Sequence, residues 1–200
     1  MKKKIDVFDY AKDITEVLGN GVLLTTKADK VNSMTIGWGN LGVIWGKPEF
    51  IVFVREHRFT KGQLDKNPEF TVNIPYGDFN KKILGYCGTK SGHDVDKVKE
   101  LNLTLEDPEI ITVPAIRELP LTLECKVNYK QIMDLNAISE ENKQSFYPQD
   151  VDSSFHGSNK DIHYRIKNHL TVYQSGKKPY TVVLSVRLFD RNKLLIVESG

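Results

Sequence analysis

One short stretch of the chain concentrates residues that could bind an anion. The stretch 54–64, VREHRFTKGQL, places Arg55, Arg58 and Lys61 around a histidine, where an apolar run gives way to a candidate helix. Unpaired N–H groups at a helix N-terminus carry partial positive charge, and guanidinium groups add paired donors. This combination suits a phosphate monoester. A solvated strand-to-helix corner, partly neutralised by neighbouring acids, is the alternative reading of the same residues.

The start of that helix has a recognisable pattern. Thr60 followed three residues later by Gln63 matches a capping box, in which the two side chains cap the first turn. The sequence therefore predicts Thr60 as the N-cap residue.

A second candidate is the glycine- and hydroxyl-rich segment 87–97, CGTKSGHDVDK. Its glycines permit close backbone approach, and Thr89, Lys90 and Ser91 supply hydrogen-bond donors for an anion. The spacing is not that of a P-loop. An ordinary loop that caps the next helix through Asp94 explains the same residues.

The third candidate is the segment 31–40, VNSMTIGWGN. Small polar residues, a methionine and a tryptophan beside glycines could line a flat apolar slot with hydrogen-bonding edges, which suits an aromatic heterocycle. A barrel strand bent at its glycines is the alternative.

The elements that must position these segments are mostly strands. Alternating or apolar runs predict strands over 22–26, one bent or two short strands over 34–45, and further strands over 50–54, 70–74 and 121–129. The run 50–54 is expected to be buried on both faces, whereas 70–74 alternates. Helices are predicted over 11–18, 60–66, 78–86 and 94–101, and a hairpin turn over 190–192. Many short strands with small helices between them predict a closed or partly closed barrel.

Composition limits the possible functions. The formal net charge of +2 makes general attraction to nucleic acid or to an anionic membrane unlikely as a function. Two widely separated cysteines predict neither a disulfide framework nor a zinc site, and the five histidines show no metal-ligand spacing. No run approaches the roughly 18 apolar residues of a membrane helix. We expect a cytoplasmic protein of one domain, 1–200, with no partner among nucleic acids or membranes.

Several motifs in order resemble the flavin reductase-like family, in its flavoredoxin branch. They are NSMTIGWG at 32–39, VREHRFT at 54–60, NPEFTVNIP at 67–75, CGTKSGHDVDK at 87–97 and LECKV at 123–127, so the likeness covers about 10–164. The resemblance implies a mainly β, FMN-binding split β-barrel, a six-stranded Greek key with short peripheral α-helices. It also implies a homodimer that binds FMN non-covalently near the subunit interface.

The resemblance also implies roles for individual residues. Contacts to the flavin ring are expected from Asn32, Ser33, Met34, Thr35 and Trp38, and contacts to the phosphate from Arg55, Arg58, Thr60 and Lys61. Lys90, Ser91, Gly92 and Asn73 complete the expected cofactor-binding set. His57 receives no role, and no catalytic or metal-binding side chain is expected, because flavin itself takes up a hydride.

The C-terminal part departs from the family pattern. After Asp161-Ile162-His163-Tyr164 a family member would continue into a further strand with its own ending, and residues 165–200 do not match that pattern.

The sequence favours an FMN-dependent oxidoreductase that passes electrons from NAD(P)H, or from a redox protein, to flavin or a downstream acceptor. Two alternatives remain open at this stage: a non-catalytic FMN-binding module on the same barrel, and a split-barrel enzyme related to pyridoxamine-phosphate oxidase.

Overall fold

The structure, a computed structural model, describes residues 3–148, 161–164, 182–187 and 196–198. Its strands are β1 (Lys3–Ile5), β2 (Val22–Lys27), β3 (Val31–Ile36), β4 (Gly39–Ile44), β5 (Lys47–Arg55), β6 (Glu69–Ile74), β7 (Leu105–Glu106), β8 (Ala115–Ile116), β9 (Leu121–Ile132), β10 (Asp161–Tyr164), β11 (Val182–Arg187) and β12 (Ile196–Glu198). Its helices are η1 (Val7–Tyr10), α1 (Ala11–Leu18), α2 (Phe59–Lys66), α3 (Lys82–Thr89), α4 (Lys97–Glu100), η2 (Leu135–Ala137) and α5 (Glu140–Phe146).

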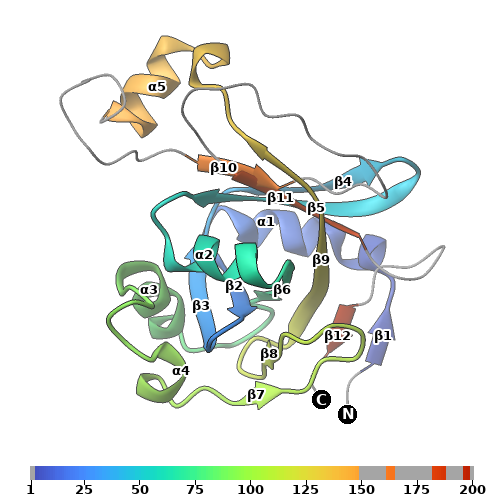
Figure 1. Cartoon of the computed structure of the whole chain (residues 1–200). Coiled ribbons are helices and arrows are strands. Elements are labelled where there is room, and N and C mark those ends of the chain that lie inside the picture. The colour runs from blue at the N-terminus through green and yellow to red at the C-terminus, as the bar shows by residue number, and fades with distance from the viewer. Residues whose placement is uncertain (1–2, 149–160, 165–181, 188–195, 199–200) are drawn as a thin grey trace.

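Ten strands pair into one sheet, whose main path runs β10-β5-β11-β9-β6-β2-β3. All the pairings between them are antiparallel, and β4 joins through β5, while β1 joins through β12. The short helices lie around this sheet, with α3 and α4 on one side and α5 above it (Figure 1). The prediction of a mainly β fold with short peripheral helices is confirmed. The six-stranded Greek key stays a prediction.

The burial of two strands differs from the sequence prediction: β5 is fully buried on one face only, whereas β6 is buried on both faces. In β5, Phe50, Val52 and Val54 face the main hydrophobic cluster, but Ile51 and Phe53 between them are only half-buried. β6 is buried throughout, because it lies between β2 and β9 and its second face is covered by the segment 113–119. Thr71 Oγ1 there donates to the carbonyl of Pro114 at 2.9 Å. Whether a strand is covered on both faces therefore depends on segments that are distant in sequence, and the periodicity of the strand itself does not reveal this.

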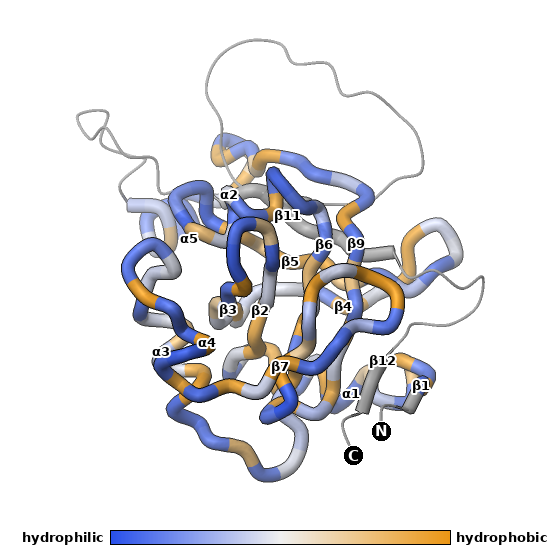
Figure 2. The backbone as a smooth tube through the Cα atoms, turned by 60° about the horizontal axis from the view of Figure 1, so that its bottom comes forward, coloured by the Kyte–Doolittle hydropathy of each residue, from blue (hydrophilic) through white to orange (hydrophobic). Residues whose placement is uncertain are grey.

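Hydrophobic stretches run along the interior strands, whereas peripheral segments are largely hydrophilic (Figure 2). α1 buries Ile14 and Leu18 against this core, as the spacing of four residues on one helix face requires. A second, smaller cluster joins Leu23 of β2 to Ile83 and Cys87 of α3. It fixes α3 against the sheet, and with it the segment that follows. None of the described helices is long and apolar enough to cross a membrane.

Most predicted element positions are close to those observed. α1 has the predicted bounds, and the stretch 34–45 forms two strands, β3 and β4, with Gly37 and Trp38 between them. The third helix was predicted too early, because Asn80 and the preceding turn delay its start to Lys82. The fourth is shorter than predicted and is capped by Asp96, whose carboxylate accepts from Lys99 N, rather than by Asp94. The hairpin predicted over 190–192 lies outside the described residues.

Candidate functional site

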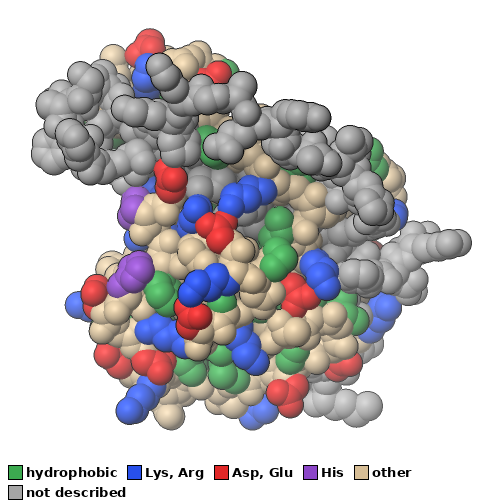
Figure 3. Space-filling model, in the orientation of Figure 1, with side chains coloured by type: hydrophobic (Ala, Val, Ile, Leu, Met, Phe, Trp, Pro, Cys, Tyr) green, Lys and Arg blue, Asp and Glu red, His purple; other side chains and the backbone are tan. Residues whose placement is uncertain are grey.

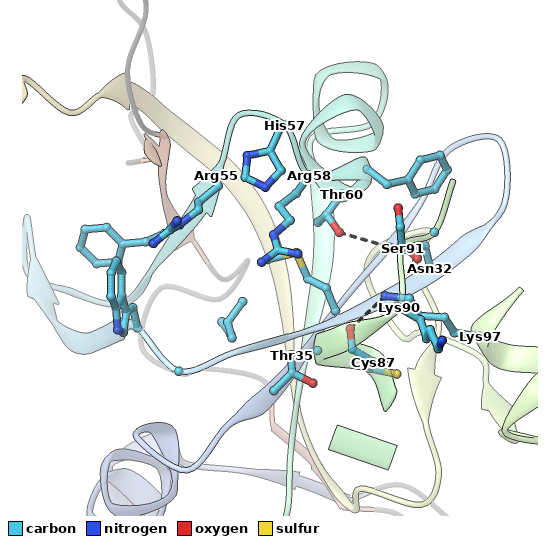
Figure 4. A pocket seen from close by; sticks show the side chains of 18 residues that line it. Asn32, Thr35, Arg55, His57, Arg58, Thr60, Cys87, Lys90, Ser91 and Lys97 are labelled. Atoms are coloured by element: carbon cyan, nitrogen blue, oxygen red, sulfur yellow. Dashed lines mark hydrogen bonds between the residues drawn. The ribbon is translucent and has the colours of Figure 1, made fainter. Parts of the chain in front are cut away.

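A cavity of about 490 Å³ lies where three segments far apart in sequence converge. Its walls come from β3 and the turn after it, from the end of β5 and the start of α2, and from the segment between α3 and α4 (Figure 4). These are the three segments that the sequence singles out. The volume falls within the usual range of small-molecule sites.

The lining of this cavity is strongly positive. Arg55, Arg58, Lys90 and Lys97 line it together with His57, and among the described residues of the lining there is neither aspartate nor glutamate. Elsewhere on the described surface in Figure 3, basic and acidic side chains are interspersed. The positive charge is therefore local, in a chain whose formal net charge is only +2.

The first turn of α2 forms one end of the cavity, and its cap differs from the prediction. Arg58, not Thr60, is the N-cap residue, and no side chain caps the helix. The capping box is therefore wrong: Gln63 Oε1 instead accepts from the backbone N–H of Ala28 at 2.8 Å, because the β2–β3 turn packs beside α2. The Thr60 hydroxyl accepts a hydrogen bond from Asn32 Nδ2 at 3.1 Å. Lys61 N donates to the Arg58 carbonyl at 3.0 Å, so the N–H groups of Phe59 and Thr60 are those that the first turn could offer to a ligand.

Gly92 allows the loop after α3 to close the opposite wall. A Cβ added at Gly92 would lie 2.6 Å from Phe59 Cδ1 and closer still to Asn32 Oδ1, so a side chain does not fit. Beside it, the Ser91 hydroxyl oxygen accepts from His93 N at 3.1 Å, which leaves the hydroxyl hydrogen to donate elsewhere. The close approach of Gly92 to the side chains of Asn32 and Phe59 brings Lys90 and Ser91 to the cavity.

An aromatic cluster lies at the other side of the cavity and engages Arg55. The Arg55 guanidinium carbon is 5.7 Å from the ring centroids of both Trp38 and Tyr147, and Nη2 donates to the Phe146 carbonyl at 3.2 Å. Trp38 also packs edge-on against Phe146, with ring centroids 5.2 Å apart. These contacts attach α5 to the rim of the cavity. Arg55 therefore contacts this cluster while also lining the cavity, and its contact with phosphate stays a prediction.

Ten of the thirteen predicted cofactor-binding residues line the cavity. They are Asn32, Met34, Thr35, Trp38, Arg55, Arg58, Thr60, Lys90, Ser91 and Gly92. One of these ten residues, Thr35, already uses its side chain within the protein, because its hydroxyl donates to the Leu84 carbonyl at 2.6 Å.

Three predicted residues lie outside the cavity lining. Ser33 is fully buried, and its hydroxyl shares a 2.7 Å hydrogen bond with Thr25. Lys61 pairs with Asp65 at 2.6 Å, one helical turn further on. Asn73 is buried in β6, where its amide donates to Thr25 and its carbonyl oxygen accepts from Ile116 N. Each of these three polar side chains therefore has a hydrogen-bond or ion-pair partner within the protein.

The cavity also contains residues for which the sequence predicts no role. Two of them carry charge or can acquire it: His57 and Lys97. Burial, followed by the charges of Arg58 and Arg55, lowers the pKa of His57. The others are Ile36, Gly37, Phe53, Phe59, Cys87 and Gly88. Burial raises the pKa of Cys87 to about 11, so this thiol stays protonated near neutral pH. Phe53 alternates with the core residues Val52 and Val54, but the run 50–54 is apolar throughout, so its periodicity did not identify Phe53.

A family model matches the part of the chain that builds this cavity, and a curated relative matches about half of the chain. The model described as "Flavin reductase like domain" matches residues 17–136. An uncharacterised protein of Archaeoglobus fulgidus is 30% identical over 106 residues, which are 52% of this chain. The chain spans 58% of the length of that relative. The residues that the family model matches contain all three walls of the cavity.

Solved structures of similar proteins agree with this match. A flavoredoxin of Methanosarcina acetivorans is 33% identical with a TM-score of 0.50, over 56% of this chain and 59% of its own. A flavoredoxin of Desulfovibrio vulgaris is 23% identical with a TM-score of 0.52, over 60% of this chain and 73% of its own, a likeness that shows the fold alone.

Proposed function

The chain belongs to the flavin reductase-like family, in its flavoredoxin branch, and from that membership we propose that it is an FMN-binding oxidoreductase. The fold is that of flavin-related oxidoreductases. The finer proposal is that the chain binds FMN and transfers electrons between NAD(P)H, or a redox protein, and the flavin or a downstream acceptor.

One observation carries this proposal: the cavity combines an apolar wall with an acid-free, positively charged end. Met34, Ile36 and Phe53 offer apolar surface to a flat ring, while Arg58, Lys90 and the first turn of α2 offer donors to an anion. FMN has both parts, a planar heterocycle and a phosphate monoester. Charge-assisted hydrogen bonds to such a phosphate are among the stronger polar interactions in proteins.

The chemistry requires little from the side chains of the protein. Flavin, when bound, supplies the hydride and electron transfer. The residues of this chain bind and orient the ring, and the walls exclude water from part of it. Cys87, whose thiol stays protonated, is not a nucleophile at neutral pH. Orientation and electrostatics are therefore what the site contributes.

We also propose that the protein acts as a homodimer, with the electron donor approaching from the rim of the cavity. Trp38 and Phe146 are partly exposed there and lie against each other. An aromatic rim of this kind is suited to contact a planar nicotinamide or the surface of a redox protein.

The deciding experiment is an absorbance titration of the purified protein with FMN, FAD and riboflavin, followed by anaerobic addition of NADH or NADPH. Tight binding of FMN with bleaching of the flavin band by a nicotinamide supports the proposal. Binding without reduction by NADH, NADPH or a chemically reduced redox protein would indicate a module that only binds flavin. A protein that binds none of the three flavins would contradict the proposal altogether.

A further inference from the structure

Lys97 is a buried lysine that belongs to the cavity but not to the expected cofactor-binding set. It is the first residue of α4, and only 3% of its surface is exposed. Its side chain extends from the helix into the cavity lining, beside Lys90 and Arg58 (Figure 4). Lysine is almost never fully buried unless its charge is paired.

In the described part of the chain, the ammonium of Lys97 contacts two backbone carbonyls. Nζ donates to Ser33 O of β3 at 2.8 Å and to Cys87 O of α3 at 2.9 Å. An ammonium has three N–H donors, so these two bonds leave one. Since both carbonyls belong to segments that form the cavity walls, the remaining donor lies at the meeting point of those walls.

No acid balances this charge in the described part of the chain. Lys97 forms no ion pair there, and the charged groups that act on it are Arg58 and Lys30, both positive. The neighbouring thiol of Cys87 stays protonated near neutral pH and is therefore uncharged. Burial, followed by those two positive charges, lowers the pKa of Lys97. A buried, unbalanced charge is unfavourable, and a bound anion would relieve it.

The two backbone contacts alone do not explain a lysine at this position. A neutral donor could bridge two carbonyls without the cost of burying a charge among other cations. The C-terminal end of α3, to which Cys87 O belongs, accounts for part of the positive charge, and a negative group in the cavity would stabilise that charge further. The rest of the lining supports this, because it presents cations and no carboxylate.

We propose that Lys97 is a ligand-binding residue of the cavity, whose third ammonium N–H is donated to the anionic group of the bound flavin nucleotide. The inference rests on the proposed function. The inference adds to the expected cofactor-binding residues one cation, which extends into the cavity from α4. The anionic group is either the phosphate or the electron-rich edge of the ring, and the experiment distinguishes these.

The test compares Lys97→Met with the control Lys99→Met, which removes an exposed lysine of the same helix. Dissociation constants for FMN and riboflavin are measured by calorimetry, and folding is checked by thermal melting. If Lys97 contacts the phosphate, Lys97→Met weakens FMN by about tenfold or more and leaves riboflavin unchanged. If it contacts the ring, both ligands weaken equally and the reduction potential of bound FMN becomes more negative. Equal binding and equal potential in Lys97→Met and Lys99→Met would overturn the proposal.

Should Lys97→Met fail to fold, Lys97→Arg decides the question, since it retains the charge and the donors. An arginine variant that melts like the wild type and binds FMN within a factor of ten supports the proposal. A folded arginine variant with a greater loss contradicts it.

Inorganic phosphate separates this inference from the proposed function. If the wild type binds no flavin, the proposed function fails. A rise in melting temperature with phosphate in the wild type, absent in Lys97→Met, would still identify Lys97 as an anion-binding residue. If the wild type binds FMN and Lys97→Met binds it equally well, the function stands and the inference fails.

Discussion

Asn32 Nδ2 donates a hydrogen bond to Thr60 Oγ1 at 3.1 Å, and this bond joins β3 to the first turn of α2. Both side chains are buried. The carbonyl oxygen of the same Asn32 side chain lies against Gly92, so this one amide contacts all three walls of the cavity. The arrangement of the site therefore depends on a side chain whose main partners are protein groups.

Breaking this bond should loosen the site from within. Asn32→Ala and Thr60→Val should each cost about 1–3 kcal/mol of unfolding free energy, because each leaves a buried polar partner unsatisfied. The double variant should cost less than the sum of the two, since both remove the same bond. Urea unfolding of the four proteins measures this. Strictly additive losses would mean that the bond is energetically unimportant.

The two arginines of the charged stretch should behave differently. Arg58 makes no hydrogen bond or ion pair through its side chain in the described region, and it lines the cavity, so Arg58→Ala should weaken FMN at least about tenfold and riboflavin little. Arg55 is engaged by the aromatic cluster, so Arg55→Ala should alter the two affinities by the same factor. Calorimetric titration of both variants with both ligands tests this. A selective loss of FMN in Arg55→Ala would contradict the assignment.

A methyl group at Gly92 should damage the site more than the same methyl at Gly85. The methyl group of Gly92→Ala would push the side chains of Asn32 and Phe59 away from residue 92. The variant should therefore be destabilised by about 1–3 kcal/mol and should bind flavin more weakly. Gly85 lies within α3, and a Cβ there meets nothing within 4 Å. Gly85→Ala should therefore stabilise the protein by up to about 1 kcal/mol. Thermal melting and FMN titration distinguish the two, and similar behaviour of both variants would refute the close packing at Gly92.

His57 should make the ligand-free protein less stable below about pH 6.5. Its pKa in the folded protein is below the ordinary value of 6.5, so on acidification the unfolded chain binds the proton first. Unfolding then becomes more favourable as the pH falls through that window. Asp65 and Glu69, whose ordinary pKa values of 3.8 and 4.5 are also lowered, add their losses only at more acidic pH.

The measurement is urea unfolding at pH 8 and pH 5.5 for the wild type and His57→Asn. The wild type should lose more stability between the two pH values than the variant. Parallel pH profiles would show that His57 does not titrate differently on folding.

The sequence alone predicted much of the fold, because strands and turns depend on local chemistry. The alternation over 121–129 marks β9, and the run over 22–26 marks β2. The double burial of β6 and the single burial of β5 were not predictable in this way. They depend on which distant segment covers each face.

The site was predictable to a similar degree and for a similar reason. The three wall segments were recognisable from their donors and glycines, yet Ser33 and Asn73 turned out to hydrogen-bond inside the sheet. Lys61 pairs with Asp65, four residues along the same helix. The sequence does not distinguish Lys97 from the other charged residues of its helix, because the burial of Lys97 results from the packing of α4 beside β3 and α3.

The positions of the two tryptophans give the protein an optical readout of its own. Trp38 lines the cavity and contacts Arg55 and Phe146, whereas Trp45 lies 52% exposed in the tight turn between β4 and β5. The emission of Trp38 overlaps the absorption of flavin, and Trp38 would lie close to a flavin in the cavity. The emission of Trp45 comes from a solvated hairpin tip. A Trp45→Phe protein would therefore report occupancy of the cavity through the fluorescence of a single indole, without any added label.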